Sequence, residues 1–154
     1  MNIVLPDEQS TEALGARLAP CLPERAMIFL DGDLGMGKTT LVRGLLRALG
    51  VTGPVKSPTF TLVEPYELDE RTVYHFDLYR TKTCDEIEGF GFRDYVAEDA
   101  ICCIEWPQRA AGMLPTPDLM LTIRLESSSR QLEILSVTPK GDAIMECFSH
   151  AKTG

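Results

Sequence analysis

The hydrophobic pattern of this chain contains two continuous apolar segments and two alternating ones. Residues 26–31 and 100–106 are the continuous segments, and such runs are typical of strands covered on both faces of a sheet. Residues 119–125 and 132–138 alternate apolar with polar positions. That alternation predicts an antiparallel pair of strands with one face in solvent.

Three other segments carry the signals of helices. Residues 7–21 have leucines at four-residue spacing and acidic residues in the first turn, as an amphipathic helix requires. Residues 38–49 collect their leucines on one side and are followed by Gly50, a residue that commonly ends helices. Residues 84–96 form an acidic, helical stretch that two glycines interrupt.

Two segments between these helices are rich in β-forming residues. They cover residues 59–66 and 72–79, and the turn between them contains Asp69 and Glu70. This spacing predicts a hairpin or two neighbouring strands.

Length and charge limit the architecture and the partners. The chain has 154 residues, the size of one ordinary domain, which we assign to residues 1–147, with a flexible tail at residues 148–154. The formal net charge is −8. Nucleic-acid binding depends on a basic surface that neutralises phosphates, so we expect contact with nucleic acid to be indirect.

The cysteines and the absence of long apolar runs bear on the compartment. The five cysteines include no C-x-x-C pair, and Cys102 and Cys103 are adjacent in an apolar run. We therefore expect free, buried thiols in a reducing compartment and no structural zinc. No run approaches the roughly 20 apolar residues of a membrane helix, so the predicted location is the cytoplasm, without a membrane partner.

A glycine-rich motif lies between the 26–31 strand and the 38–49 helix. Its residues are Gly32-Asp33-Leu34-Gly35-Met36-Gly37-Lys38-Thr39, which fit the phosphate-loop pattern G-x-x-x-x-G-K-[ST] in full. Lys38 is expected to reach the β- and γ-phosphates and Thr39 to give a hydroxyl to Mg²⁺. The predicted cofactors are ATP or ADP with Mg²⁺, and the predicted nucleotide contacts within the motif are Asp33, Leu34, Gly35, Met36, Gly37, Lys38, Thr39 and Thr40.

The order of the elements, with this motif, predicts the fold class. Strand, loop, helix and strand in succession are typical of an α/β domain. We expect a single P-loop NTPase domain whose largely parallel central sheet has helices on both faces. The two alternating segments near the C-terminus would add an antiparallel edge.

Two acids follow apolar segments and are candidates for chemistry. Asp77 ends the segment Val-Tyr-His-Phe, and Glu105 ends Ile-Cys-Cys-Ile. We expect Asp77 to hold Mg²⁺ directly or through water, and Glu105 to orient or deprotonate the attacking water. The alternative for each is an acid at a strand end in solvent.

Several other side chains have two open interpretations. Thr59, in the sequence Ser-Pro-Thr-Phe, is a candidate Mg²⁺ ligand of a switch loop or part of an ordinary turn. Trp106 is a candidate nucleotide contact or a core aromatic. Arg80 and Arg109 are candidate phosphate or partner contacts, or surface arginines, and His75 is best interpreted as a satisfied strand histidine.

Four motifs taken in order resemble one known family. They are Gly32-Asp33-Leu34-Gly35-Met36-Gly37-Lys38-Thr39-Thr40, Ser57-Pro58-Thr59-Phe60-Thr61-Leu62, His75-Phe76-Asp77-Leu78-Tyr79-Arg80 and Ile104-Glu105-Trp106-Pro107. Between about residues 7 and 125 the chain resembles the bacterial TsaE (YjeE) family, ATPases needed for making threonylcarbamoyladenosine in tRNA.

This resemblance implies partners and roles. Members act with TsaB and TsaD, and TsaD transfers the threonylcarbamoyl group to the adenosine next to the anticodon, so tRNA is a partner only indirectly. Carried over by motif, Lys38 and Thr39 are phosphate-loop residues and Thr59 is the switch threonine. Asp77 is the Walker B acid, and the Glu-Trp pair at 105–106 lies at the nucleotide site.

Two other functions are compatible with a phosphate loop. A small-molecule kinase usually needs a basic lid or acceptor pocket, but the 15 lysines and arginines are scattered along the chain. A non-hydrolysing, ATP-dependent binding switch also remains open. A GTPase is disfavoured, because guanine recognition commonly uses N-K-x-D and the only asparagine is Asn2.

Overall fold

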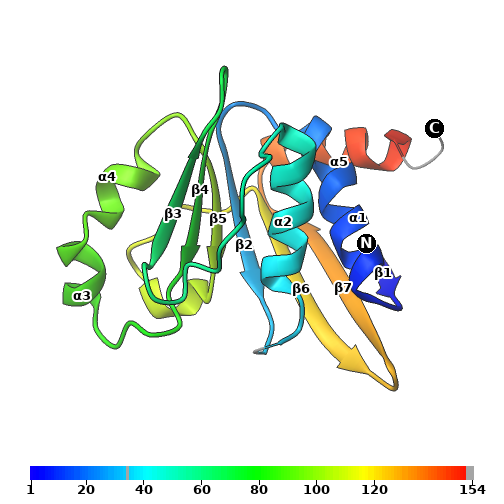
Figure 1. The fold of residues 1–154 in the computed structure, drawn as a ribbon, viewed down its shortest axis with the longest axis horizontal. Helices are drawn as coiled ribbons and strands as arrows, with labels where there is room; N and C mark the ends of the chain where they lie inside the picture. Colours follow the sequence, from blue (N-terminus) through cyan, green and yellow to red (C-terminus); the bar gives the residue numbers. More distant parts are fainter. Residues whose placement is uncertain (34, 152–154) are drawn as a thin grey trace.

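A mixed, seven-stranded β-sheet runs through the molecule (Figure 1). The structure is a computed structural model that describes residues 1–33 and 35–151. In chain order the strands are β1 (Asn2–Leu5), β2 (Ala26–Asp31), β3 (Val63–Glu67), β4 (Thr72–Asp77), β5 (Ile101–Glu105), β6 (Leu119–Glu126) and β7 (Ser129–Ser136). Across the sheet their order is β1-β7-β6-β2-β5-β4-β3.

The centre of the sheet is parallel, as the sequence predicts. Strand β2 pairs in parallel with β5 on one side and with β6 on the other, and β5 pairs in parallel with β4. The carboxyl ends of these strands therefore meet at one edge of the sheet, which is the lower edge in Figure 1. In register, Asp77 at the end of β4 faces Glu105 at the end of β5.

Both outer parts of the sheet are antiparallel. Strands β6 and β7 form the predicted C-terminal antiparallel pair, and β1 from the N-terminus pairs with β7 to make the outermost strand. At the other end β3 and β4 form the predicted hairpin. The prediction of an antiparallel C-terminal edge is confirmed, but the opposite edge is antiparallel as well.

Helices cover both faces, as predicted. In chain order they are α1 (Glu8–Leu18), the short 3₁₀ helix η1 (Ala19–Cys21), α2 (Lys38–Leu49), α3 (Cys84–Gly89), α4 (Phe92–Val96), the 3₁₀ helix η2 (Pro107–Ala110) and α5 (Pro139–Ala151). Alternate residues of the central strands divide between two apolar cores: Ile28 and Leu30 of β2 pack with α1, α2 and α5, while Phe29 packs with α3 and α4.

Helices α1 and α2 lie side by side on their face of the sheet (Figure 1). Two glycines allow this contact. A Cβ atom on Gly44 would lie 1.9 Å from the Glu12 carbonyl oxygen, and one on Gly15 would lie 2.0 Å from the Leu41 carbonyl oxygen. Because no real Cβ can approach backbone so closely, the glycines fix where α2 and its N-terminus sit on the sheet.

The C-terminal helix α5 corrects the predicted tail. The sequence analysis assigns residues 148–154 to a flexible tail, but α5 continues to Ala151. Phe148 is fully buried in the core shared with α1, and the Arg17 guanidinium lies 4.5 Å from its ring centroid. Ile144 and Phe148 are four residues apart and therefore share the helix face that packs on the core. Residues 152–154 lie outside the described residues.

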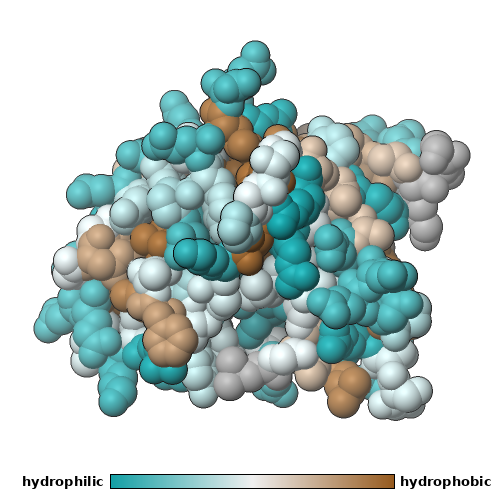
Figure 2. Space-filling model, viewed as in Figure 1, coloured by the Kyte–Doolittle hydropathy of each residue, from teal (hydrophilic) through white to brown (hydrophobic). Residues whose placement is uncertain are grey.

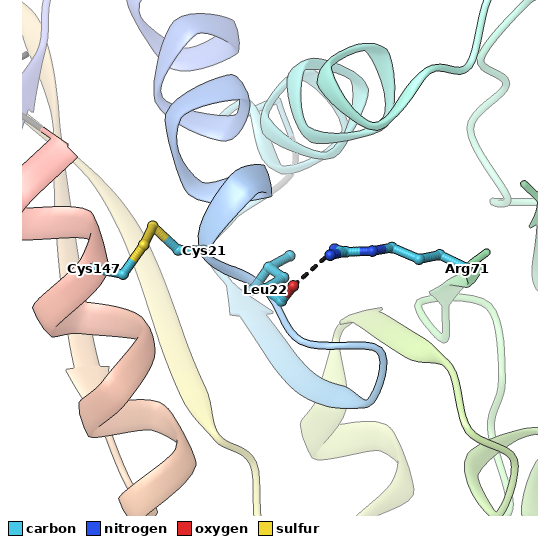
Figure 3. The surroundings of a disulfide bond; sticks show 4 residues. All are labelled: Cys21, Leu22, Arg71 and Cys147. Carbon is cyan, nitrogen blue, oxygen red and sulfur yellow. Dashed lines mark hydrogen bonds between the residues drawn. A yellow bond between two sulfur atoms is a disulfide. The ribbon is translucent and has the colours of Figure 1, made fainter. Parts of the chain in front are cut away.

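A disulfide contradicts the expectation that all the cysteines are free. Cys21 in η1 is bonded to Cys147 in α5 across a sequence separation of 126 residues, as Figure 3 shows. Next to it the Arg71 side chain donates to the Leu22 carbonyl oxygen at 2.7 Å. Cys102 and Cys103 do remain as buried free thiols, and burial raises the pKa of Cys102 to about 12.

The surface shows mostly hydrophilic residues on the face drawn in Figure 2, with hydrophobic residues in separate small groups. Phe60, with 78% of its surface exposed, is the most exposed large hydrophobic residue among the described residues. Within residues 1–33 and 35–151 no helix is long and apolar enough to span a membrane.

Candidate nucleotide-binding site

The glycine-rich loop links β2 to the first residue of α2 at the carboxyl edge of the sheet. Gly37 is the N-cap of α2 and has φ +104°, a backbone conformation that residues with a side chain rarely adopt. No side chain caps this helix end. The N–H groups of its first turn are therefore available to an anion, which the helix dipole also favours.

A cavity of about 400 Å³ opens beside this helix end. It is lined by residues from the glycine-rich loop, from α2, from the ends of β4 and β5, and from three separate segments. The lining residues are Glu8, Gly35, Gly37, Lys38, Thr39, Thr40, Ser57, Thr59, Asp77, Glu105, Trp106 and Arg130.

Most of the nucleotide-site residues predicted from the sequence line this cavity. Of the remaining ones, Asp33 and Met36 are joined by a hydrogen bond from the Met36 N–H to the Asp33 carbonyl oxygen, 3.2 Å. Met36 packs against the core on the α2 face, and neither residue lines the cavity. Leu34 lies outside the described residues.

Lys38 is almost completely buried, with 4% of its surface exposed. Its ammonium donates to the Gly32 carbonyl oxygen and lies 4.1 Å from the centroid of the Trp106 ring. Burial lowers the pKa of Lys38, while the nearby charges, Glu105 first, oppose that shift. A desolvated cation of this kind interacts strongly with an anion that enters the cavity.

Thr39 and His75 hold Glu105 in place. The Thr39 hydroxyl donates to Glu105 Oε2 at 3.0 Å, and His75 Nε2 lies 2.6 Å from the same oxygen. Glu105 is 3% exposed and His75 is fully buried. The structure thus brings Thr39, which follows the glycine-rich loop, and the acid at the end of β5 into direct contact.

Asp77 is held by a different group of residues. The Thr59 hydroxyl donates to Asp77 Oδ2 at 3.2 Å, and the Tyr79 N–H donates to Oδ1 at 3.0 Å. Burial raises the pKa of Asp77, and the Tyr79 N–H partly offsets that effect. The segment with Thr59 is a tight turn that precedes β3, in which Leu62 takes φ +70°. Thr59 therefore lies in a strained loop rather than in the strand predicted for residues 59–66.

Trp106 ends the β5 segment by turning the chain. Its backbone is left-handed, with φ +58° and ψ +51°, and it is the N-cap of η2. Its indole ring lies 4.9 Å from the ring of Tyr79. The indole N–H is buried and has no hydrogen-bond partner among the described residues, while other parts of the residue line the cavity.

The two arginines named as candidates lie at the edge of this region. The Arg109 guanidinium is 5.7 Å from the Tyr79 ring centroid, and the Arg80 guanidinium is 4.1 Å from the ring of Phe60. Neither lines the cavity.

Arg130 and Glu8 line the cavity but were not identified from the sequence. Arg130, at the start of β7, donates through Nη2 to the Gly35 carbonyl oxygen at 3.3 Å. A Cβ on Gly37 would lie 3.1 Å from its Nη1. This contact joins residues 95 positions apart, and no local pattern signals it. Glu8 has the ordinary features of an acid in the first turn of a helix.

The oxygen-bearing side chains of the cavity suit a small, hard cation. Two hydroxyls and two carboxylates line it, from Thr39, Thr59, Asp77 and Glu105, and each hydroxyl donates to one of the carboxylates. Mg²⁺ prefers such oxygen ligands and keeps water and phosphate oxygens in its shell. Among the described residues there is no group of three or more His, Cys, Asp or Glu side chains that could hold a metal ion.

Comparison with known proteins identifies the family. The family model described as "Threonylcarbamoyl adenosine biosynthesis protein TsaE" matches residues 5–133. The chain belongs to the TsaE family. The resemblance inferred from the four motifs is thereby confirmed.

Individual relatives extend this result over nearly the whole chain. The tRNA threonylcarbamoyladenosine biosynthesis protein TsaE of Haemophilus influenzae is 44% identical over 151 residues, which are 95% of this chain and 96% of that protein. The protein of the same name from Bacillus subtilis is 33% identical over 142 residues, 92% of this chain and 89% of the relative.

A solved structure agrees with the fold as well. The crystal structure of Bacillus subtilis YdiB superimposes with a TM-score of 0.84 at 26% identity, covering 99% of this chain and 95% of that one. The names of the TsaE relatives connect the family with threonylcarbamoyladenosine biosynthesis in tRNA.

Proposed function

We propose that this protein binds ATP with Mg²⁺ through the Gly32–Thr39 P-loop and hydrolyses the ATP. We further propose that this activity supports threonylcarbamoyladenosine biosynthesis in tRNA. The observation that carries the proposal is the cavity at the N-terminus of α2. There a buried lysine, an uncapped helix end and two carboxylates converge on a space of about 400 Å³.

Each part of the cavity corresponds to one part of the reaction. Lys38 and the N–H groups of the first turn of α2 would bind the β- and γ-phosphates. Thr39 would give its hydroxyl to Mg²⁺, which when bound neutralises charge on the phosphate oxygens. Asp77 and Glu105 would divide the remaining tasks of holding the metal ion and orienting the attacking water.

The hydrogen bonds favour a division between the two acids that differs from the one expected from the sequence. Glu105 accepts from Thr39, the proposed metal ligand, so we assign Glu105 to the metal side. Asp77 accepts from Thr59 in the Ser-Pro-Thr-Phe loop. We therefore assign Asp77 and Thr59 to the side of the γ-phosphate and the attacking water, with Thr59 as a further candidate metal ligand.

The proposed partners are the TsaB and TsaD proteins, with tRNA contacted through them. The net charge of −8 supports the indirect role of tRNA, since like charge opposes binding to the nucleic-acid backbone. Submicromolar binding to tRNA alone at physiological salt, with no response to TsaB and TsaD, would contradict this part.

An assay of phosphate release from ATP tests the proposal, carried out with the protein alone and then with TsaB, TsaD and tRNA. We expect Mg²⁺-dependent hydrolysis that is slow alone and faster with the partners. ATP binding without turnover under every condition would support a non-hydrolysing switch instead. Transfer of phosphate to a metabolite in a screen of small molecules would support a kinase.

A further inference from the structure

His75 is a buried polar side chain in a part of the sheet where its neighbours are apolar. It lies on β4 on the same face as Val73, and beside Cys103 of β5 in register. Val73, Ile101 and Cys103 all belong to the core under α2. His75 is fully buried, and burying an imidazole costs free energy unless it is hydrogen-bonded. Packing alone therefore does not explain a histidine here.

Within the described part of the chain, the one side-chain hydrogen bond of His75 goes to an acid of the proposed site. Nε2 lies 2.6 Å from Glu105 Oε2. We propose that His75 is a positioning residue that fixes the orientation of the Glu105 carboxylate. This inference rests on the proposed function only for the role of Glu105, since the hydrogen bond itself can be tested without ATP.

The geometry explains how the hydrogen bond positions the acid. Both hydrogen bonds to the Glu105 carboxylate among the described residues, from His75 and from Thr39, end on the same oxygen, Oε2. Two donors from opposite elements, β4 and α2, restrict rotation of the carboxylate. The other oxygen, Oε1, is left to accept from a ligand in the cavity. Partners of this kind typically change metal affinity or activity by about 10–100-fold when they are removed.

The proton on the imidazole follows from the same contact. An ionised carboxylate only accepts hydrogen bonds, so Nε2 of His75 must carry the proton and donate. Nδ1 is buried and has no partner among the described residues. A ring with its proton on Nε2 leaves only an acceptor without a partner at Nδ1, whereas a proton on Nδ1 alone would leave Glu105 without a donor from His75.

Three variants test the positioning role by kinetics. His75→Leu removes the donor, and His75→Gln keeps an N–H near the position of Nε2. Tyr74→Phe is the control, because it removes a buried hydroxyl that contacts Glu98 from the other face of the same strand. We expect His75→Leu to lower kcat by roughly tenfold or more and to raise the Mg²⁺ concentration needed for half-maximal activity. His75→Gln should recover most of both, and Tyr74→Phe should leave both unchanged.

A double-mutant cycle separates positioning from a structural effect. In the Glu105→Gln background, His75→Leu should lower kcat less than twofold further, because the group it positions is already altered. An equal loss in both backgrounds, or wild-type kinetics and Mg²⁺ dependence for His75→Leu, would overturn the proposal.

Nuclear magnetic resonance of the ligand-free protein gives a test that needs neither turnover nor the leucine variant. The chain has two histidines, so the imidazole ¹⁵N spectrum is simple to assign. We expect the Nε2–H tautomer for His75, with an Nε2 resonance that shifts in Glu105→Gln but not in Tyr74→Phe. The Nδ1–H tautomer, or no response to Glu105→Gln, would overturn the proposal. If these shifts appear but no ATP is bound or hydrolysed, the proposed function fails and the contact stands.

Discussion

The parallel centre of the sheet and its antiparallel wing differ in whether their polar side chains are buried. By the wing we mean β6, β7 and β1. On the wing strands the buried positions are apolar, for example Ile123, Leu132 and Ile134, and polar side chains such as Glu133 are partly exposed. In the centre, His75, Asp77 and Glu105 are nearly or fully buried.

This difference separates stability from chemistry. Buried charged groups cost desolvation energy, so a fold selected for stability alone would place them in water, as the wing does. Burial lowers the pKa of Lys38 and raises the pKa of Asp77. Each shift favours the neutral form, so the charged form of either side chain costs desolvation free energy. We therefore expect changes in the wing to alter unfolding and changes in the centre to alter ligand binding or turnover.

The largest expected effect on stability is at Phe148 of α5, a helix that packs against β7 of the wing. Phe148→Ala should lower the free energy of unfolding by about 3–5 kcal/mol, because it empties a fully buried aromatic site. Nucleotide affinity of the folded fraction should not change. Urea unfolding measures the loss, with Ser149→Ala, an exposed neighbour, as the control. A loss below about 1 kcal/mol, typical of a surface change, would mean that the end of α5 is frayed.

Lys38 should give the opposite result. A unit charge about 4 Å from a phosphate is worth roughly 4 kcal/mol at an effective dielectric of 20, before desolvation is subtracted. Lys38→Ala should thus weaken Mg²⁺-ATP binding by about a hundredfold or more. The free energy of unfolding should fall less in Lys38→Ala than in Phe148→Ala. Calorimetry measures the affinity, and Arg124→Ala on β6, an exposed loss of the same charge, is the control. Unchanged affinity in Lys38→Ala would remove the basis of the proposed function.

The disulfide between Cys21 and Cys147 should again affect stability alone. It closes a loop of over a hundred residues, and such cross-links typically contribute about 2–4 kcal/mol. Reduction should lower unfolding stability by that amount without changing nucleotide affinity. Alkylation in denaturant without reductant should modify only Cys84, Cys102 and Cys103. Modification of all five cysteines would show that the bond is absent in solution.

Substitutions of the two acids should have smaller effects, and these effects should differ between Glu105 and Asp77. If the hydrogen bonds assign the roles correctly, Glu105→Gln should weaken Mg²⁺-dependent binding by roughly tenfold. Asp77→Asn should keep binding and lower turnover. Neither change should lower unfolding stability by more than about 1 kcal/mol, since each removes a buried charge but keeps the shape of the side chain. Mg²⁺ titrations and single-turnover assays distinguish them, and the reverse pattern would restore the roles expected from the sequence.

Local sequence patterns were sufficient to predict the parallel centre and most of the residues that line the candidate site. The strand at 26–31, the glycine-rich loop and the α2 helix are consecutive, and each has its own signal in hydrophobic period or glycine position. Asp77 and Glu105 were candidates because each ends an apolar segment, and the parallel pairing of β4 with β5 places them side by side. These predictions needed no knowledge of long-range contacts.

Most of the features that sequence analysis missed depend on long-range contacts. Helix α5 has Gly141 in its first turn, which weakens the local helix signal, and packing of Phe148 on the core stabilises it. The pairing of two distant cysteines cannot be deduced from their spacing. Arg130 reaches the glycine-rich loop only because the hairpin of β6 and β7 folds toward it.

The smallest expected effect concerns Trp106, which stands where the centre meets the cavity. Its left-handed backbone turns the chain after Glu105 and brings the indole over the Lys38 ammonium at 4.1 Å. A phosphate that binds Lys38 would therefore change the surroundings of this ring.

Because Trp106 is the only tryptophan, its fluorescence reports on this cavity alone. We expect its emission to shift when Mg²⁺-ATP is added, and expect no shift in Lys38→Ala at the same concentration. Trp106→Leu should keep the fold but remove the aromatic ring over Lys38, lowering affinity by a factor of about two to five, as a cation–π contact of about 0.5–1 kcal/mol allows. A saturating titration of the wild-type protein without any change in emission, together with full affinity in Trp106→Leu, would show that the indole only packs against its neighbours.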